Sequence, residues 1–153
     1  MEQAQVLTFL NNKDRDLLLQ FCGYSTTEPL HSFGPAVRPH YIIHFILNGK
    51  GIFQIREKTY HLETGQGFLI EPDELTFYQS DAQEPWEYLW IGFNGKMIPE
   101  FLKQIGLSSA HPIFHCDKKK ELYWLVNDML VHSKSNFSSD QLDYYMNFFL
   151  FLP

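Results

Sequence analysis

The sequence predicts a mainly β domain, a closed sandwich or barrel, with helices confined to its last third. Short segments rich in β-branched and aromatic residues recur through the first two-thirds and are separated by Gly and Pro. After Asn94-Gly95 the apolar residues recur instead at helical intervals. We therefore divide the 153 residues into a barrel, residues 1–95, and a helical segment, residues 96–153.

The expected strands come in chain order and end at turn-forming residues. Asn48-Gly49-Lys50-Gly51 is a strong hairpin signal, so the strand after this turn is expected to pair with the strand before it. In the last strand Trp86, Tyr88 and Trp90 alternate onto one face. The segments expected as strands are 17–24, 41–47, 52–56, 59–62, 68–70, 75–78 and 86–93.

Three helices are expected after the strands. The first covers 96–105 and ends at Gly106, and Asp117 can cap a second. The second helix has its apolar residues at helical spacing, namely Leu122, Leu125, Val126, Met129 and Leu130. Residues 138–140, Ser-Ser-Asp, can cap the third.

The third helix has an apolar stripe that is too large to stay in water, made of Leu142, Tyr145, Met146 and Phe149. The stripe either packs on the chain's own barrel or joins two copies of the chain. We expect the second arrangement, a homodimer interface. The helical pattern breaks off at Pro153, which predicts that the natural sequence continues.

The charge distribution argues against nucleic-acid binding by this segment. The net charge is -6, and the basic run 118–120 is followed at once by Glu121. The first residues do not resemble a secretory leader, and no apolar run approaches the roughly 18 residues that span a bilayer. Two cysteines, Cys22 and Cys116, are in keeping with a reducing compartment. We expect a cytoplasmic location.

The sequence contains no readable metal or catalytic motif. His40 and His44 share one face of a strand, but residues four apart in a strand lie about 13 Å apart and do not easily chelate one ion. The spacings Cys-x-x-Cys, His-Glu-x-x-His and Gly-x-Ser-x-Gly are absent. We therefore expect no metal, no cofactor and no catalytic residue.

An aromatic cluster is the most informative feature. Tyr78, Trp86, Tyr88 and Trp90 are expected within one strand pair. The C–H faces of a sugar ring stack on Trp, while its hydroxyls need directed polar partners. Arg38 could supply these, because a guanidinium carries five donors in fixed geometry. The residues alone leave another interpretation open, in which the Trp rings are core and Arg38 forms a surface ion pair.

Three segments in order resemble the amino-terminal effector-binding domain of the AraC family of transcriptional regulators. They are Phe33–His44 with the 48–51 turn, Leu62–Pro72 and Pro85–Gly95. The last segment is similar in particular to regulators of multiple-sugar and raffinose-type operons in Gram-positive bacteria. The resemblance covers residues 15–150.

The resemblance implies a cupin-like jelly-roll barrel that binds a small carbohydrate, followed by dimerisation helices. It also implies a linker and two helix-turn-helix units, beyond Pro153, that bind DNA. Trp90 falls on the family's stacking Trp and Tyr78 on its Tyr. Tyr88 replaces a His, and Arg38 lies a few residues from the family's Arg.

The function implied is that of a sensor and not of an enzyme. The alternative is a metal-dependent cupin enzyme that acts on a small carbohydrate. Where cupin enzymes usually have a His after the segment Gly-x-Gly-x-x-x-x-Pro, this sequence has Thr76 beside Phe77. The departure favours the sensor.

Overall fold

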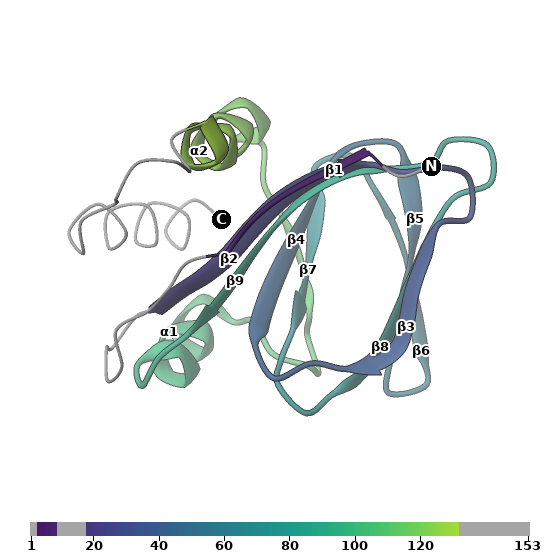
Figure 1. Ribbon diagram of the computed structural model, residues 1–153. Helices are drawn as coiled ribbons and strands as arrows, with labels where there is room; N and C mark the ends of the chain where they lie inside the picture. Colours follow the sequence, from purple (N-terminus) through teal and green to yellow (C-terminus); the bar gives the residue numbers. More distant parts are fainter. Residues whose placement is uncertain (1–2, 9–17, 132–153) are drawn as a thin grey trace.

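The computed structural model describes residues 3–8 and 18–131, and these form two antiparallel β-sheets and two helices (Figure 1). The mainly β class is confirmed. One sheet has the strand order β1-β2-β9-β4-β7-β10, and the other has the order β3-β8-β5-β6. The strands are β1 (Gln3–Thr8), β2 (Leu18–Thr26), β3 (Ser32–Val37), β4 (Tyr41–Asn48), β5 (Lys50–Ile55), β6 (Lys58–Glu63), β7 (Gln66–Ile70), β8 (Leu75–Ser80), β9 (Glu87–Asn94) and β10 (Ile113–His115).

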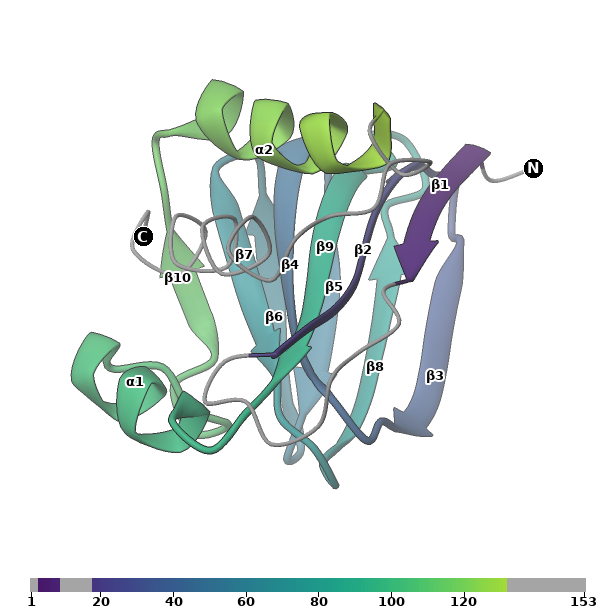
Figure 2. The same ribbon diagram turned by 60° about the vertical axis from the view of Figure 1, so that its left-hand side comes forward.

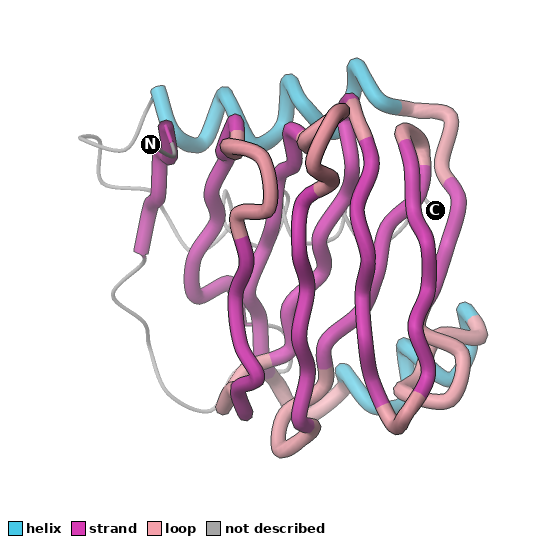
Figure 3. The backbone as a smooth tube through the Cα atoms, turned by 90° about the vertical axis from the view of Figure 1, so that its right-hand side faces the viewer, coloured by secondary structure: helices cyan, strands magenta, loops and turns pink. Residues whose placement is uncertain are grey.

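The elements form three layers. The helices α1 (Ile98–Ile105) and α2 (Lys119–Val131) cover the outer side of the six-stranded sheet, near opposite ends of its strands (Figure 2). The four-stranded sheet covers the inner side, and in Figure 3 this sheet faces the viewer. Two cores result, one between the sheets and one beneath the helices.

Strand β4 separates the two cores. Its residues 42–47 are all buried, because alternate side chains enter opposite cores. Ile42 and Ile46 lie in the core between the sheets, whereas Ile43, Phe45 and Leu47 lie in the core under the helices. A strand buried on both faces belongs in the middle of a sheet, and β4 has β7 and β9 as its two neighbours.

The predicted pairing across the 48–51 turn is wrong. β4 and β5 belong to different sheets, so this turn carries the chain from one sheet to the other. Both edges of β4 are already paired, which leaves no position for β5. Gly49 has φ 79° while Asn48 and Lys50 do not have positive φ, whereas a tight type I′ hairpin turn needs two successive positive φ values.

Each of the seven predicted strands overlaps an observed one, and β1, β3 and β10 were not predicted. Strand β3 contains Gly34-Pro35, two residues that usually end strands, and its register shifts at this point. Strand β10 has only three residues, which is too short for an alternating pattern to be read.

The two described helices agree with the predicted ones. α1 ends at Gly106, whose φ of 78° is left-handed and whose amide bonds back to the carbonyls of Leu102 and Lys103. α2 begins two residues after Asp117 and buries Leu122, Leu125 and Val126. No helix among the described residues is long and apolar enough to cross a bilayer. The third predicted helix, with Leu142, Tyr145, Met146 and Phe149, lies outside the described residues.

Candidate functional site

The aromatic residues singled out in the sequence meet in the core between the two sheets. Trp86, just before β9, and Tyr88 and Trp90 within it all face this core, as predicted. Tyr78 reaches the same cluster from β8, which belongs to the other sheet, so the expectation of one strand pair for all four was wrong. The Tyr78 ring faces β9 across the interior, with centroids 6.2 Å from Tyr88 and 6.5 Å from Trp86.

Exposure increases along β9 toward one side of the cluster. Trp86 is 0% exposed, Tyr88 is 4% exposed, and Trp90 is only partly buried. Beside Trp86 a polar network closes the barrel: Thr27 Oγ1 donates to the Trp86 carbonyl at 2.6 Å, and Ser80 Oγ accepts from the Trp86 amide at 3.2 Å. Of these three aromatic side chains, only Trp90 is therefore partly accessible to solvent.

Five partly or largely exposed residues contact the cluster or one another at its border, and we call them the rim: Phe21, Phe33, Arg38, His40 and Trp90. The Phe21 ring fills the space over Gly92, where a Cβ atom would collide with it. His40 packs edge-on against that ring, with centroids 5.4 Å apart. These contacts connect the start of β4 with β2 and β9.

Arg38 reaches the site through stacked rings. Its guanidinium carbon lies 4.7 Å from the centroid of Phe33, in cation–π geometry. Phe33 in turn stacks on Tyr78, with centroids 5.6 Å apart and planes 18° apart. The structure thus connects all four predicted site residues (Arg38, Tyr78, Tyr88 and Trp90) through one continuous series of ring contacts. Tyr78, at 5% exposure, and Tyr88 lie beneath the rim as floor, not as rim.

His44 is a site residue that sequence reasoning missed. It was considered only as a partner of His40 for a metal ion. In the structure it lies directly across from Trp90 in the ladder between β4 and β9, and its side chain is 2% exposed. Burial, and secondarily the charge of Arg38, lowers the pKa of the imidazole to about 3. The alternation of buried positions 42, 44 and 46 was the available signal.

Two imidazoles of the site have an unused nitrogen. Nδ1 of His40 and Nδ1 of His44 are buried and have no hydrogen-bond partner among the described residues. Buried polar atoms normally have a partner, and an exception calls for a physical reason. Desolvation by burial also lowers the pKa of His40, followed by the charge of Arg38, which favours a neutral ring in both cases.

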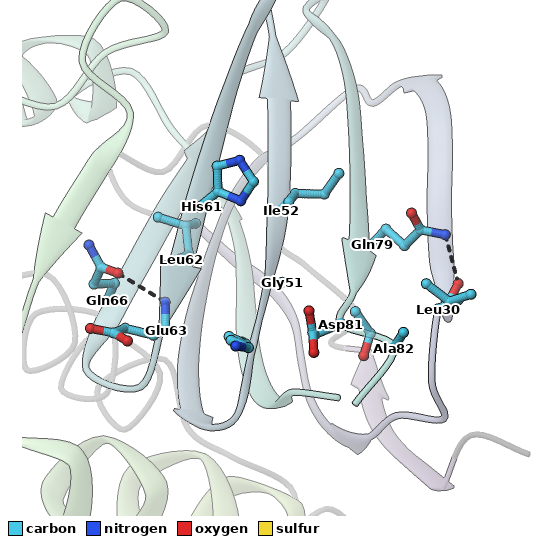
Figure 4. Close-up of a pocket in the computed structure, with 12 residues that line it drawn as sticks. Leu30, Gly51, Ile52, His61, Leu62, Glu63, Gln66, Gln79, Asp81 and Ala82 are labelled. Carbon is cyan, nitrogen blue, oxygen red and sulfur yellow. Dashed lines mark hydrogen bonds between the residues drawn. The ribbon is translucent and has the colours of Figure 1, made fainter. Parts of the chain in front are cut away.

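A hollow lies on the outer face of the four-stranded sheet and has about 690 Å³ of space (Figure 4). Gln79, Ile52 and His61 stand in a row across its floor. Several of its polar groups are already used: Gln79 Nε2 donates to the Leu30 carbonyl at 3.1 Å, and Gln66 Oε1 accepts from the Glu63 amide at 2.9 Å. Its described lining includes no Phe, Tyr or Trp. The rim therefore suits a sugar ring better.

Neither metal binding nor thiolate chemistry finds support within residues 3–8 and 18–131. No group of three or more His, Cys, Asp or Glu side chains in this part could hold a metal ion. Cys22 and Cys116 are buried free thiols. Burial raises the pKa of the Cys22 thiol to about 12, so this cysteine is not available as a nucleophile at neutral pH.

The family follows from a comparison with known proteins. Residues 18–140 match the family model described as the AraC-like ligand binding domain. The chain belongs to this family. The AraC-family resemblance seen in the sequence is confirmed, and the curated relatives that match are transcriptional regulators, not enzymes.

Three curated relatives illustrate this. The Msm operon regulatory protein of Streptococcus mutans is 45% identical over 101 residues, which are 66% of this chain and 35% of the relative. The lactose operon transcription activator of Staphylococcus xylosus is 30% identical over 83% of this chain and 46% of its own length. The raffinose operon transcriptional regulatory protein of Pediococcus pentosaceus is 29% identical over 81% of this chain and 50% of its own length. The chain thus spans half or less of each relative.

Solved structures confirm the cupin-like fold. The protein YhaK of Escherichia coli aligns with a TM-score of 0.53 and 14% identity, over 61% of this chain and 45% of its own. A Cupin 2 conserved barrel domain protein of Salinispora arenicola aligns with a TM-score of 0.50 and 14% identity, over 67% of this chain and 84% of its own. At such identities the likeness concerns the fold alone.

Proposed function

We propose that this chain is the effector-sensing and dimerisation domain of a transcriptional regulator of sugar utilisation, and that it binds a small carbohydrate at the rim. One observation carries the proposal: Trp90 offers a partly exposed indole next to Tyr88 and the buried, neutral His44, and Arg38 joins the same cluster through Phe33 and Tyr78. An indole face matches the C–H face of a sugar, and the polar groups match its hydroxyls. The family of the chain supplies the regulatory context.

Each site residue has a distinct role in the proposal. Trp90 stacks on the sugar ring, and Arg38 donates to its hydroxyls while Phe33 holds the guanidinium in place. Tyr78 and Tyr88 form the floor, which fixes how deeply the ring can enter. No step of this recognition requires a metal or a cofactor.

The regulatory output belongs to the full-length protein. A sugar that binds two arrangements of the domain with unequal affinity shifts their populations, and this changes how the protein engages DNA. DNA would be bound by a helix-turn-helix domain outside this chain, in the cytoplasm. A homodimer formed through Leu142, Tyr145, Met146 and Phe149 would place two such domains on adjacent half-sites.

The names of the relatives suggest which sugars to test first. Lactose and raffinose both contain a galactose ring, so the panel comprises lactose, raffinose, melibiose, galactose, sucrose, glucose and arabinose. A sugar at 100 times its dissociation constant stabilises the folded domain by about 2.7 kcal/mol, a shift that thermal melting detects. Calorimetric titration of the best binder should give one site per chain. If no sugar of the panel raises the melting temperature even at a high concentration, the proposal is contradicted.

Elemental analysis distinguishes the sensor from the alternative enzyme. We expect purified protein to contain no stoichiometric transition metal and to bind its sugar equally well after treatment with a chelator. A bound metal at one equivalent per chain, with sugar turnover that the chelator abolishes, would favour the metal-dependent cupin enzyme instead.

A further inference from the structure

His44 lies inside a stack of aromatic rings. Its imidazole is nearly parallel to Phe68 on one side, with centroids 4.6 Å apart and planes 11° apart, and to Tyr88 on the other, at 5.3 Å and 21°. Tyr78 and Trp90 complete the surroundings at 4.8 Å and 6.1 Å. Strands β4, β7, β8 and β9 thus all contribute to the enclosure of this one ring.

The position is poorly suited to a histidine if stability were its only role. Ile42 and Ile46, its neighbours on the same face of β4, are buried and apolar. A phenylalanine could keep the stacking without a polar atom. Nδ1 of His44 has no hydrogen-bond partner among the described residues, and an unsatisfied buried polar group destabilises the folded state. Such local conflicts are expected where a residue serves binding.

The chemistry of the ring defines the missing partner. Because burial keeps the imidazole neutral, one nitrogen donates a hydrogen bond and the other accepts one. A carboxylate or phosphate matches only the donor, and an ammonium matches only the acceptor. A hydroxyl group can use either nitrogen, since it both donates and accepts.

The neighbourhood defines where this partner comes from. His44 is paired directly with Trp90, the rim residue on which we place the sugar ring. We place the sugar on the exposed part of the indole with its nearer hydroxyls toward the His44 ring, whose centroid is 6.1 Å from that of the indole. The imidazole also borders both floor residues, Tyr78 and Tyr88, so it lies where the deepest hydroxyl of the sugar would arrive.

We infer that His44 determines specificity by forming a hydrogen bond with one hydroxyl of the carbohydrate that stacks on Trp90. The inference rests on the proposed function and adds the residue that selects among sugars. A site built to hydrogen-bond a hydroxyl discriminates strongly against an analogue that lacks it, because its own polar group is then left buried without a partner. An effector without that hydroxyl should fail to bind even where it fits.

The test compares His44→Phe with wild type and with His61→Phe, a matched change on the outer face of the other sheet. The probes are lactose and raffinose, each with monodeoxy analogues of its galactose ring. For the better-binding probe, His44→Phe should raise the Kd at least about 10-fold, in line with a lost hydrogen bond in a buried site. Without sugar, the same variant should melt about 2–6 °C higher, since an unsatisfied polar group is gone. His61→Phe should change neither value.

The deoxy analogues give the most specific readout. One of them should bind wild type much more weakly than its parent sugar but bind His44→Phe as well as the parent does, because the variant no longer reads that hydroxyl. An unchanged Kd in His44→Phe overturns the inference and leaves the proposed function standing. A raised Kd together with a lower melting temperature also overturns it, since this indicates a structural role. A wild type that binds neither probe nor any panel sugar overturns both.

A measurement on the wild-type protein covers the case in which His44→Phe does not fold. With ¹⁵N-labelled histidine, the ring nitrogens of His44 are recognised because this imidazole stays neutral at about pH 5. Addition of the bound probe should shift one of these nitrogen resonances by several ppm. Resonances that do not move at saturation overturn the inference.

Discussion

Replacing Trp90 by Ala tests the proposed site most directly. Part of the indole is already in contact with the protein, at centroid distances of 5.4 Å from Tyr88 and 6.1 Å from His44. Trp90 is only partly buried, and we place the sugar on its exposed part, next to these two rings. The substitution removes this surface and leaves Arg38 and the floor residues unchanged.

The expected loss of affinity follows from the area that the sugar would cover. Aromatic side chains can bury 150–250 Å² each, so we take roughly 100 Å² for the available half of the indole. At about 25 cal/mol per Å² this contact contributes about 2.5 kcal/mol, or a Kd about 70-fold higher in the variant. Because Trp90 is only partly buried, the cost to folding should stay below the 3–5 kcal/mol typical of a fully buried Trp.

The assay is calorimetric titration with the best sugar of the panel, with Trp124→Ala as the control. Trp124 is 53% exposed on α2, on the far side of the six-stranded sheet, so its removal should leave the Kd unchanged. Fluorescence adds a second readout: sugar binding should change the emission of wild type and of Trp124→Ala but not that of Trp90→Ala.

The proposed role of Trp90 is refuted if Trp90→Ala is folded, by circular dichroism and cooperative melting, and binds sugar within twofold of wild type. In that case Trp90 is a core residue of the barrel and the sugar lies elsewhere. Equal losses in Trp90→Ala and Trp124→Ala would indicate a general effect on folding.

Three further predictions concern acid stability, packing and assembly. The pKa of His44 is lowered from 6.5 to about 3, so between these pH values protons bind preferentially to the unfolded chain. The domain should therefore lose stability as the pH falls from about 6.5 toward 3, by up to about 1.4 kcal/mol per pH unit from this residue, and this residue should cause no such dependence above pH 7. Urea unfolding of wild type and His44→Phe across this range measures the difference. In Gly67→Ala the new Cβ would collide with the Phe114 ring and lie 2.5 Å from the His44 carbonyl oxygen. We therefore expect the free energy of unfolding to fall by about 1–3 kcal/mol. A loss below about 0.5 kcal/mol would show that β7 and β10 can shift to make room for the methyl group. If wild type is a dimer by light scattering at about 100 μM, Met146→Glu should convert it to monomer by burying a charge at the interface. A wild-type monomer would indicate instead that the apolar stripe packs on its own domain or needs a carboxyl-terminal part that this sequence does not include.

The sequence was informative where local patterns decide the structure. Period-two alternation placed Trp86, Tyr88 and Trp90 on one face, and the structure confirms this. Gly106 marked the end of α1, because glycine readily adopts the left-handed conformation in which the amide after a helix bonds back to the last carbonyls. These features depend on a few consecutive residues.

Features that depend on distant pairing could not be obtained in the same way. The 48–51 turn looks like a hairpin, and only the pairing of β4 with β7 and β9 shows that it connects two sheets. His44 and Trp90 are 46 positions apart in the chain, so their contact depends on the register of β4 against β9. Alternation fixes the face of a side chain but not its partner across the sheet.

The burial of β4 on both faces has a mechanical consequence. Residues of this strand that face the site alternate with residues that support α1 and α2, so the two cores are one peptide unit apart. A close-packed interior resists compression, and a sub-ångström shift of the strand is felt on both sides at once. A sugar that shifts the inner face of β4 would thus also shift the β4 side chains on which α1 and α2 pack. In the proposed sensor, a single strand separates the sugar site from the core beneath the helices.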